Sequence, residues 1–370
     1  MIRQIVLTGG PCAGKTTALV RIVDHFTSLG YKVFTVPEVP TLYSLGGWNY
    51  LTPNRRLYYE GERAILDTQL SLEDNFLAMA RVCTKPVLIV CDRGAMDISA
   101  YMSPDMWAEL TALQHTTPAQ LRDRYDAVLH LVSAADGAEQ YYTVATNSTR
   151  YEQADEEGLR TARELDRKVM CAWAGHPHLR VINNHDDFEQ KMNRVIREIA
   201  SVLGLPQPVT NERKYIVSIT GPLPETIDSD ILQTYLVAEP GTEVRLRRRT
   251  WSSGKTVNIL NTKKRTGPAE QIETDRQVEN ALYESLLRQS DPDRHPISKR
   301  RQSFIWRGQY FEIDTYQAPL DGLVILETKG IADAEPVNFP PFVRVSKEIT
   351  GNPDYTNYNL ARKDRPQENW

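Results

Sequence analysis

The stretch Gly9-Gly10-Pro11-Cys12-Ala13-Gly14-Lys15-Thr16 decides the fold of the first half of the chain. It follows an apolar run over residues 2–8 and precedes a segment with helical spacing over residues 16–30. A G-x-x-x-x-G-K-[ST] pattern between a strand and a helix is typical of a phosphate-binding loop, because its backbone N–H groups and the helix N-terminus attract anions. We therefore expect a nucleotide's phosphates to be bound by Gly9, Gly10, Ala13, Gly14, Lys15, Thr16 and Thr17, with Thr16 holding Mg²⁺.

Strand-like and helix-like segments alternate from this loop to about residue 205. This rhythm predicts an α/β domain with a parallel sheet covered by helices. The segment Leu205-Pro206-Gln207-Pro208 interrupts it. We expect a P-loop domain over residues 1–205, a second domain over 211–345 and a tail over 346–370.

Composition supports a globular protein of two domains. The chain has 370 residues, of which 41% are hydrophobic and 25% are charged. We expect no membrane span, because no apolar run approaches ~18 residues, and the N-terminus does not resemble a signal peptide. None of the four cysteines forms a C-x-x-C pair, which predicts free thiols and no zinc site. These features favour a cytoplasmic protein.

Five further positions in the first half are candidates for the chemistry. Asp92 ends a buried strand at Asp92-Arg93-Gly94, where a carboxylate can serve Mg²⁺ or accept a proton from a hydroxyl. Glu38 follows the second strand, and we expect it, with Arg93, to meet the acceptor substrate. Arg150 and Arg160 lie in an arginine-rich stretch that could close over the transferred phosphoryl group.

The first half resembles the small-molecule P-loop kinases, especially the nicotinamide-riboside-kinase-like ATPase family. The resemblance rests on Gly9–Thr17, on the turn at Glu38, on Asp92-Arg93-Gly94 and on the segment Trp173–Arg180. It implies phosphoryl transfer from a nucleotide. No guanine-reading N/T-K-x-D box is found, so the choice between ATP and GTP stays open.

The second half has a different pattern. Alternating strands are expected at residues 213–220, 243–251, 255–263, 299–306, 309–316 and 323–328, with a helix at 276–288. Turns at Ser252-Ser253-Gly254 and Arg307-Gly308 indicate two hairpins. This pattern predicts a mostly antiparallel domain closed into a β-barrel.

A basic strand dominates this half. Side chains alternate along a strand, so Arg245, Arg247 and Arg249 share one face and need water or a polyanion. Lys214, Lys263 and Arg301 would join them in a closed sheet. We disfavour nucleic acid as the partner, because positive and negative residues balance over residues 206–370.

This half resembles the CYTH, or triphosphate tunnel, family through Glu212-Arg213-Lys214, Glu243–Arg247, Lys263, Arg301, Asp314 and Glu327. The resemblance implies a tunnel that binds polyphosphate chains, with Mg²⁺ or Mn²⁺ held by Glu212, Asp314 and Glu327. Two family carboxylates are replaced by Thr210 and Lys329, which favours anion binding over hydrolysis. The two halves together resemble the TRPL-translocation-defect-type family, which is linked to GTP and phosphoinositide binding.

The favoured interpretation is a Mg²⁺-dependent enzyme that transfers a phosphoryl group from ATP or GTP to a small molecule, with a tunnel domain that binds a phosphorylated ligand. One alternative is a nucleotide-switched protein whose CYTH-like domain recognises phosphoinositide or polyphosphate, which leaves peripheral lipid contact open. Another is a triphosphatase in the tunnel domain.

Overall fold

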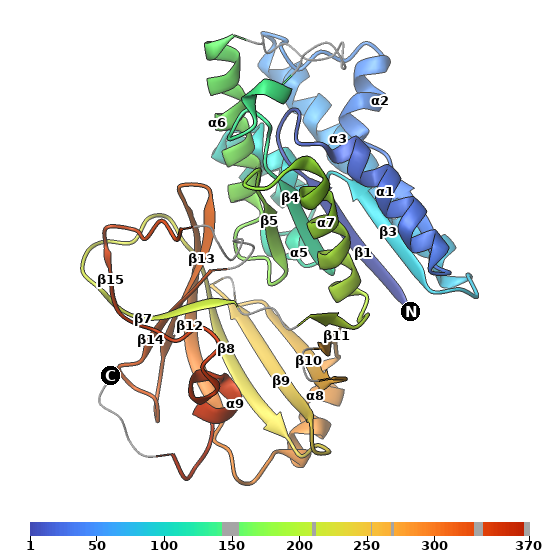
Figure 1. The fold of residues 1–370 in the computed structure, drawn as a ribbon. Coiled ribbons are helices and arrows are strands. Elements are labelled where there is room, and N and C mark those ends of the chain that lie inside the picture. The colour runs from blue at the N-terminus through green and yellow to red at the C-terminus, as the bar shows by residue number, and fades with distance from the viewer. Residues whose placement is uncertain (143–154, 209–211, 253, 268–269, 329–335, 366–370) are drawn as a thin grey trace. The chain divides into compact units, whose positions relative to one another are not determined.

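A computed structural model describes residues 1–142, 155–208, 212–252, 254–267, 270–328 and 336–365. The chain forms two compact units, Met1–Ile196 and Arg197–Trp370. Figure 1 shows a helix-flanked sheet in the first unit and a larger sheet in the second.

The first unit contains a five-stranded sheet in the order β2-β3-β1-β4-β5, in which every neighbouring pair is parallel. Its strands are β1 (Ile2–Thr8), β2 (Lys32–Val36), β3 (Val87–Asp92), β4 (Ala127–Leu131) and β5 (Leu179–Ile182). The side chains of β4 are all buried, and β3 is buried up to Cys91. Burial on both faces is typical of a parallel sheet covered by helices, so the predicted α/β fold is confirmed.

Helices connect and flank these strands. They are α1 (Lys15–Ser28), α2 (Val39–Leu45), α3 (Arg55–Arg81), α4 (Pro104–Leu113), α5 (Pro118–Arg122), α6 (Glu156–Ala172) and α7 (Phe188–Val202), with short 3₁₀ turns η1 (Ala95–Ala100) and η2 (Glu139–Tyr141). Side-chain caps fix where the two longest begin: Asn54 accepts from the first N–H groups of α3, and Asp155 accepts from Gly158 N in α6. Along the chain, the division between the two units falls within α7.

The second unit contains one ten-stranded sheet in the order β15-β7-β14-β13-β12-β8-β9-β10-β11-β6, antiparallel throughout. Its strands are β6 (Gln207–Pro208), β7 (Arg213–Ile219), β8 (Ile227–Leu236), β9 (Thr242–Trp251), β10 (Thr256–Arg265), β11 (Glu270–Gln277), β12 (Ile297–Trp306), β13 (Gln309–Tyr316), β14 (Val324–Thr328) and β15 (Val343–Glu348). The helices are α8 (Asn280–Leu286) and α9 (Asn357–Leu360), with 3₁₀ turns η3 (Leu287–Gln289) and η4 (Pro353–Tyr355).

The predicted antiparallel domain is confirmed, but the predicted closed barrel is wrong. Within the described residues, β15 and β6 are the two edges of an open sheet. Hydrophobic alternation predicts strands but does not predict whether the first and last strands pair. The predicted helix over 276–288 is also too long, because β11 extends to Gln277 and α8 begins only at Asn280.

Among the helices in the described ranges, none combines the length and the apolar character needed to cross a bilayer.

Candidate active site

The loop between β1 and α1 has the backbone of a phosphate-binding loop. Gly9 has φ +143°, and a Cβ there would overlap the carbonyl oxygen of Leu131. Gly14 has φ +89° at the N-terminus of α1. Glycine is needed at both positions, because side-chain-bearing residues rarely adopt these conformations. The N-terminus of α1 therefore opens directly onto the loop, as anion binding requires.

Asp166 on α6 contacts the phosphate-binding loop. Its Oδ1 accepts a 2.6 Å hydrogen bond from Gly10 N and lies 3.2 Å from His130 Nε2. Burial disfavours the charged carboxylate, but His130 and Gly10 N together lower the pKa of Asp166 below its usual value. A Cβ on Gly10 would lie 2.7 Å from Asp166 Oδ1. Asp166 therefore sets the position of the loop.

Two lysines contact the loop. Lys15 Nζ donates to Gly9 O at 3.1 Å and to Gly10 O at 3.4 Å, and burial followed by repulsion from Arg93 lowers its pKa. Lys191 on α7 donates to Ala13 O at 3.1 Å, and burial lowers its pKa to about 7. Among the described residues Lys15 Nζ hydrogen-bonds only to backbone carbonyls, so its ammonium group can turn toward a phosphate.

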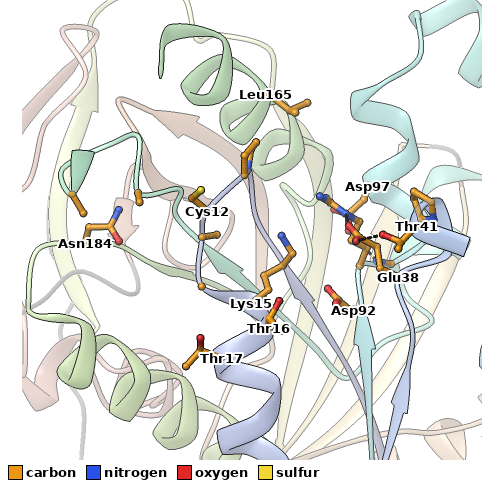
Figure 2. Close-up of a pocket in the computed structure, with 18 of the residues that line it drawn as sticks. Cys12, Lys15, Thr16, Thr17, Glu38, Thr41, Asp92, Asp97, Leu165 and Asn184 are labelled. Carbon is orange, nitrogen blue, oxygen red and sulfur yellow. Dashed lines mark hydrogen bonds and ion pairs between the residues drawn. The ribbon is translucent and has the colours of Figure 1, made fainter. Parts of the chain in front are cut away.

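Asp92 stands at the end of β3, beside β1. Its Oδ1 is buried and has no hydrogen-bond partner in the described part of the chain. Burial raises the pKa of Asp92, although Lys15 opposes this shift. In Figure 2 the side chains of Lys15, Thr16 and Asp92 face a common space. A carboxylate oxygen without a partner, beside a threonine hydroxyl, fits Mg²⁺, which prefers oxygen ligands. Phosphates and water usually complete its coordination shell.

Glu38 and Arg93 form an ion pair next to Asp92. Arg93 Nε donates to Glu38 Oε1 at 2.5 Å, and Thr41 Oγ1 donates to Glu38 Oε2 at 2.6 Å. Burial alone would raise the pKa of Glu38, but Arg93 and Lys15 outweigh it and lower the pKa to about 2. Arg93 has φ +70°, so the turn after β3 aims its side chain at this partner. Glu38 is therefore ionised at neutral pH.

One cavity of about 1160 Å³ is lined by Lys15, Glu38, Asp92, Arg93 and Lys191. On one side of the loop it is bordered by residues from 134–141 and 184–191, and on the other by residues of α2, α3 and η1. Figure 2 shows this division, with Asn184 on one side of Lys15 and Glu38 and Thr41 on the other. The cavity therefore offers space on both sides of the phosphate-binding loop.

In the second unit, strand register gathers charged side chains on one face of the sheet. Directly opposed residues of antiparallel strands share a face. Arg245 and Arg247 of β9 oppose Tyr235 and Gln233 of β8. Residues of β8 on this same face in turn oppose residues of β12. Continuing across the sheet, this charged face carries Lys214, Glu243, Arg245, Arg247, Arg249, Lys263, Glu273, Asp275, Lys299, Arg301, Glu312, Asp314 and Glu327.

The carboxylates of this face are engaged by cations. Arg301 donates to both oxygens of Asp314, at 2.7 and 2.6 Å, and Lys299 lies 2.5 Å from the same carboxylate. Lys214 Nζ donates to Glu327 Oε1 at 2.9 Å and lies 3.4 Å from Glu212. Among the described residues, no three His, Cys, Asp or Glu side chains are placed so that they could hold a metal ion.

Arg247 differs from its neighbours on the face. Arg245 pairs with Glu273 at 3.2 Å, and Arg249 lies over the ring of Trp251. Arg247 has no hydrogen bond or ion pair with any described residue, and burial followed by repulsion from Arg245 lowers its pKa to about 10. Asp275 attracts Arg247 but does not outweigh burial and the neighbouring arginines. An arginine held among other cations without a hydrogen bond or ion pair is a candidate anion site.

The sequence profile of a family described as "AAA domain" matches residues 4–191, about half of the chain. The chain belongs to this family. No curated protein matches the chain. Among solved structures, one titled the hypothetical protein NE1496 is 27% identical, with 41% of this chain and 97% of that chain covered and a TM-score of 0.32. One titled the inorganic triphosphatase NE1496 is 26% identical over 41% and 95%, also at 0.32.

Within the AAA domain, most of the predicted site residues lie together. Ala13, Gly14, Lys15, Thr16, Thr17, Glu38, Asp92 and Arg93 line the cavity. Arg160 does not: its side chain is 69% exposed on α6 and lies 3.3 Å from Glu157. The buried side of α6 carries Asp166 instead, which turns Arg160 toward solvent. Arg150 lies outside the described residues, as do Thr210 and Lys329 of the second half.

Sequence reasoning missed Asp166, Lys191 and Glu62 in the AAA domain. Asp166 carries a visible signal, because it stands on the apolar stripe of α6 with Ala162 and Met170. An acid on such a stripe is costly to bury without a partner.

Proposed function

We propose that the AAA domain transfers the γ-phosphoryl group of ATP or GTP to a hydroxyl group of a small molecule, in a Mg²⁺-dependent reaction that Mn²⁺ could also support. The observation that carries this proposal is the buried, unpartnered Oδ1 of Asp92, placed between the phosphate-binding loop and the α2–α3 side of the cavity. A carboxylate there can accept the proton that an attacking hydroxyl loses.

The loop residues supply the positioning that phosphoryl transfer requires. Backbone N–H groups from Gly9 to Thr17 would hold the phosphates, and Lys15 would neutralise charge that develops on the transferred group. Thr16 and Asp92 would hold the metal, which would neutralise further phosphate charge. Asp166 keeps the loop in place through its hydrogen bond to Gly10 N. Transfer depends on such pre-set geometry more than on covalent chemistry.

The second side of the cavity favours transfer over simple hydrolysis. Side chains from α2, α3 and η1 border it, and Glu38 and Arg93 line it as an ion pair. Hydrolysis needs space only for water, whereas a chamber beyond Asp92 leaves space for an acceptor. No catalytic role is assigned to Arg160 in this proposal.

For the second unit we propose a CYTH-like role, in which the charged face binds a phosphorylated or polyphosphate ligand. Arg247 favours this role, because an anion would supply the ion pair that Arg247 does not make with any described residue. The engagement of Asp314 by Arg301 and Lys299 supports binding rather than metal-dependent triphosphate hydrolysis. The nucleotide-switched alternative predicts the same ligand for this face. It differs in predicting that no acceptor changes the rate of nucleotide turnover.

The test of transfer measures ATP and GTP consumption with and without a pool of small cellular metabolites. We expect the pool to accelerate consumption, and Lys15→Ala to abolish both nucleotide binding and turnover. Asp92→Asn should reduce acceptor-dependent turnover by about 100-fold while nucleotide affinity in the absence of Mg²⁺ changes less than about threefold.

Asp24→Asn is the matched control, because Asp24 is exposed on α1 and does not line the cavity. It should behave as the unmodified protein does. Slow consumption that no metabolite fraction accelerates would contradict phosphoryl transfer and favour the nucleotide-switched alternative.

A further inference from the structure

Glu62 is a buried carboxylate on the acceptor side of the AAA-domain cavity. It belongs to α3, is only 5% exposed and lines the cavity. Across the described ranges its carboxyl group makes no hydrogen bond or ion pair. Burial raises the pKa of Glu62 to about 7, and the titratable groups that face it are the phenols of Tyr58 and Tyr101.

A second buried glutamate on the same helix shows what a structural carboxylate looks like. Glu73 is fully buried, and it accepts hydrogen bonds from Gln69, Tyr125 and Arg124 at 2.7–3.1 Å. Its packing satisfies it without any ligand. Glu62 lies three turns earlier and has none of these partners, although it too is largely buried. This contrast indicates that the partner of Glu62 comes from outside the chain.

Aromatic side chains accompany Glu62. Trp48, Tyr50 and Tyr101 line the same side of the cavity. Gly61 lets the indole of Trp48 pack directly on α3, because a Cβ at Gly61 would lie 2.5 Å from Trp48 Cζ2. The ring is thereby fixed against the residue that precedes Glu62. A carboxylate beside aromatic faces is the combination that proteins use to bind organic cations.

The charge on this side of the cavity points the same way. Among the described residues that line it near α2 and α3, Arg93 is the basic side chain, and Glu38 already pairs with it. Asp97 is held by Thr8 and Trp173. Glu62 therefore faces the chamber without an ion pair in the described chain, whereas Asp92 is attracted by Lys15 and Arg93. An anionic acceptor would meet repulsion there, and a cationic one would meet attraction.

We propose that the acceptor is an alcohol that carries an organic cation such as an ammonium group, with the cation bound between Glu62 and the aromatic rings and the hydroxyl directed at Asp92. This inference rests on the proposed phosphoryl transfer for the role of the hydroxyl. The binding of the cation itself does not depend on turnover.

The test uses matched pairs of probes that have the same shape and differ in charge: choline with 3,3-dimethylbutan-1-ol, and tyramine with 4-propylphenol. Dissociation constants are measured by NMR titration of the full chain, with Mg²⁺ and a non-hydrolysable nucleotide present. We expect the cationic member of at least one pair to bind about tenfold more tightly than its neutral twin.

Glu62→Gln keeps the shape of the side chain and removes its charge, and we expect it to reduce this preference to less than about threefold. Glu60→Gln is the matched control, because Glu60 is exposed on the same helix and pairs with Arg63 at 2.9 Å. It should retain the full preference. Thermal unfolding of each variant shows that a lost preference does not come from a lost fold.

The results separate this inference from the proposed function. A Glu62-dependent preference for cations supports the inference even when no nucleotide is consumed. Three results would overturn it. The charged and neutral probes could bind equally, neither cation could bind at concentrations up to about 10 mM, or the preference could survive Glu62→Gln. Acceptor-dependent turnover with a neutral or anionic alcohol would overturn the inference and leave phosphoryl transfer intact.

Discussion

Replacing Arg247 with methionine should stabilise the sheet of the second unit and remove its response to a polyanion. Arg247 stands on the charged face of β9 without an ion pair in the described chain, and repulsion from Arg245, Arg301 and Arg249 adds to its burial and outweighs attraction by Asp275. Methionine fills similar space without a charge. The variant therefore removes an unfavourable interaction that a bound anion would otherwise relieve.

The expected size follows from the pKa. Lowering the pKa of Arg247 to about 10 corresponds to about 3 kcal/mol of unfavourable interaction with the charged form. Because the folded-state pKa lies below the unfolded-state value, the penalty is fully present at every pH below about 10 and fades above it. Arg247 is only partly buried, so water reduces the figure, and we expect a gain of roughly 1–3 kcal/mol at pH 7.

Hydrogen exchange on peptides from β8 to β10 measures this gain in the full chain. We expect exchange by local opening to slow about 10- to 100-fold in Arg247→Met. Tripolyphosphate should slow exchange in the unmodified protein and have little effect on the variant. Arg248→Met is the matched control: Arg248 faces the other side of β9 and bonds Asn258 at 3.0 Å and Glu284 at 2.8 Å.

Loss of those bonds should loosen the sheet in the control while the response to tripolyphosphate remains. The reasoning is refuted if Arg247→Met speeds exchange as Arg248→Met does, or if tripolyphosphate protects Arg247→Met as well as it protects the unmodified protein.

Three further predictions concern the AAA domain. Asp166→Asn should weaken nucleotide binding about 10- to 100-fold, measured by calorimetry, because the charged acceptor of the Gly10 N–H bond is lost; unchanged affinity would contradict a positioning role. Gly10→Ala should have an effect at least as large, since its Cβ would lie 2.7 Å from Asp166. Glu62→Gln should raise the free energy of unfolding above pH 7 by up to about 3 kcal/mol and leave it unchanged below about pH 4. The sign follows because the folded-state pKa of Glu62 is raised to about 7, so stability is lost as pH rises toward that value; a variant whose denaturation midpoint keeps the original pH dependence would exclude this effect.

Local sequence determined what could be predicted of the first unit. The glycines and Lys15 specify the loop because their roles depend on neighbours within eight residues. The strands β1 and β3 are buried from Gln4 to Thr8 and from Val87 to Cys91, and both read as largely apolar runs. Asp166 lies 156 residues from the N–H group that it binds, so only the tertiary fold brings them together.

In the second unit the predictable part was the alternation along single strands. The arginines of β9 share a face as expected, because a strand's side chains alternate regardless of its partners. The strand β11 escaped prediction because Glu270, Glu273 and Asp275 are poor strand formers. The structure shows a reason for acids there, since Glu273 pairs with Arg245. Closure of the sheet depends on long-range pairing and was wrongly predicted.

The fate of a labelled γ-phosphoryl group tests the central claim most directly. The protein is incubated with Mg²⁺, γ-¹⁸O-labelled ATP or GTP and a pool of small metabolites, and the products are analysed by mass spectrometry. We predict that the label appears on a phosphorylated small molecule, and that neither Lys15→Ala nor Asp92→Asn forms it at a comparable rate. Label found only in inorganic phosphate, at a rate that the metabolites do not change, would contradict the account.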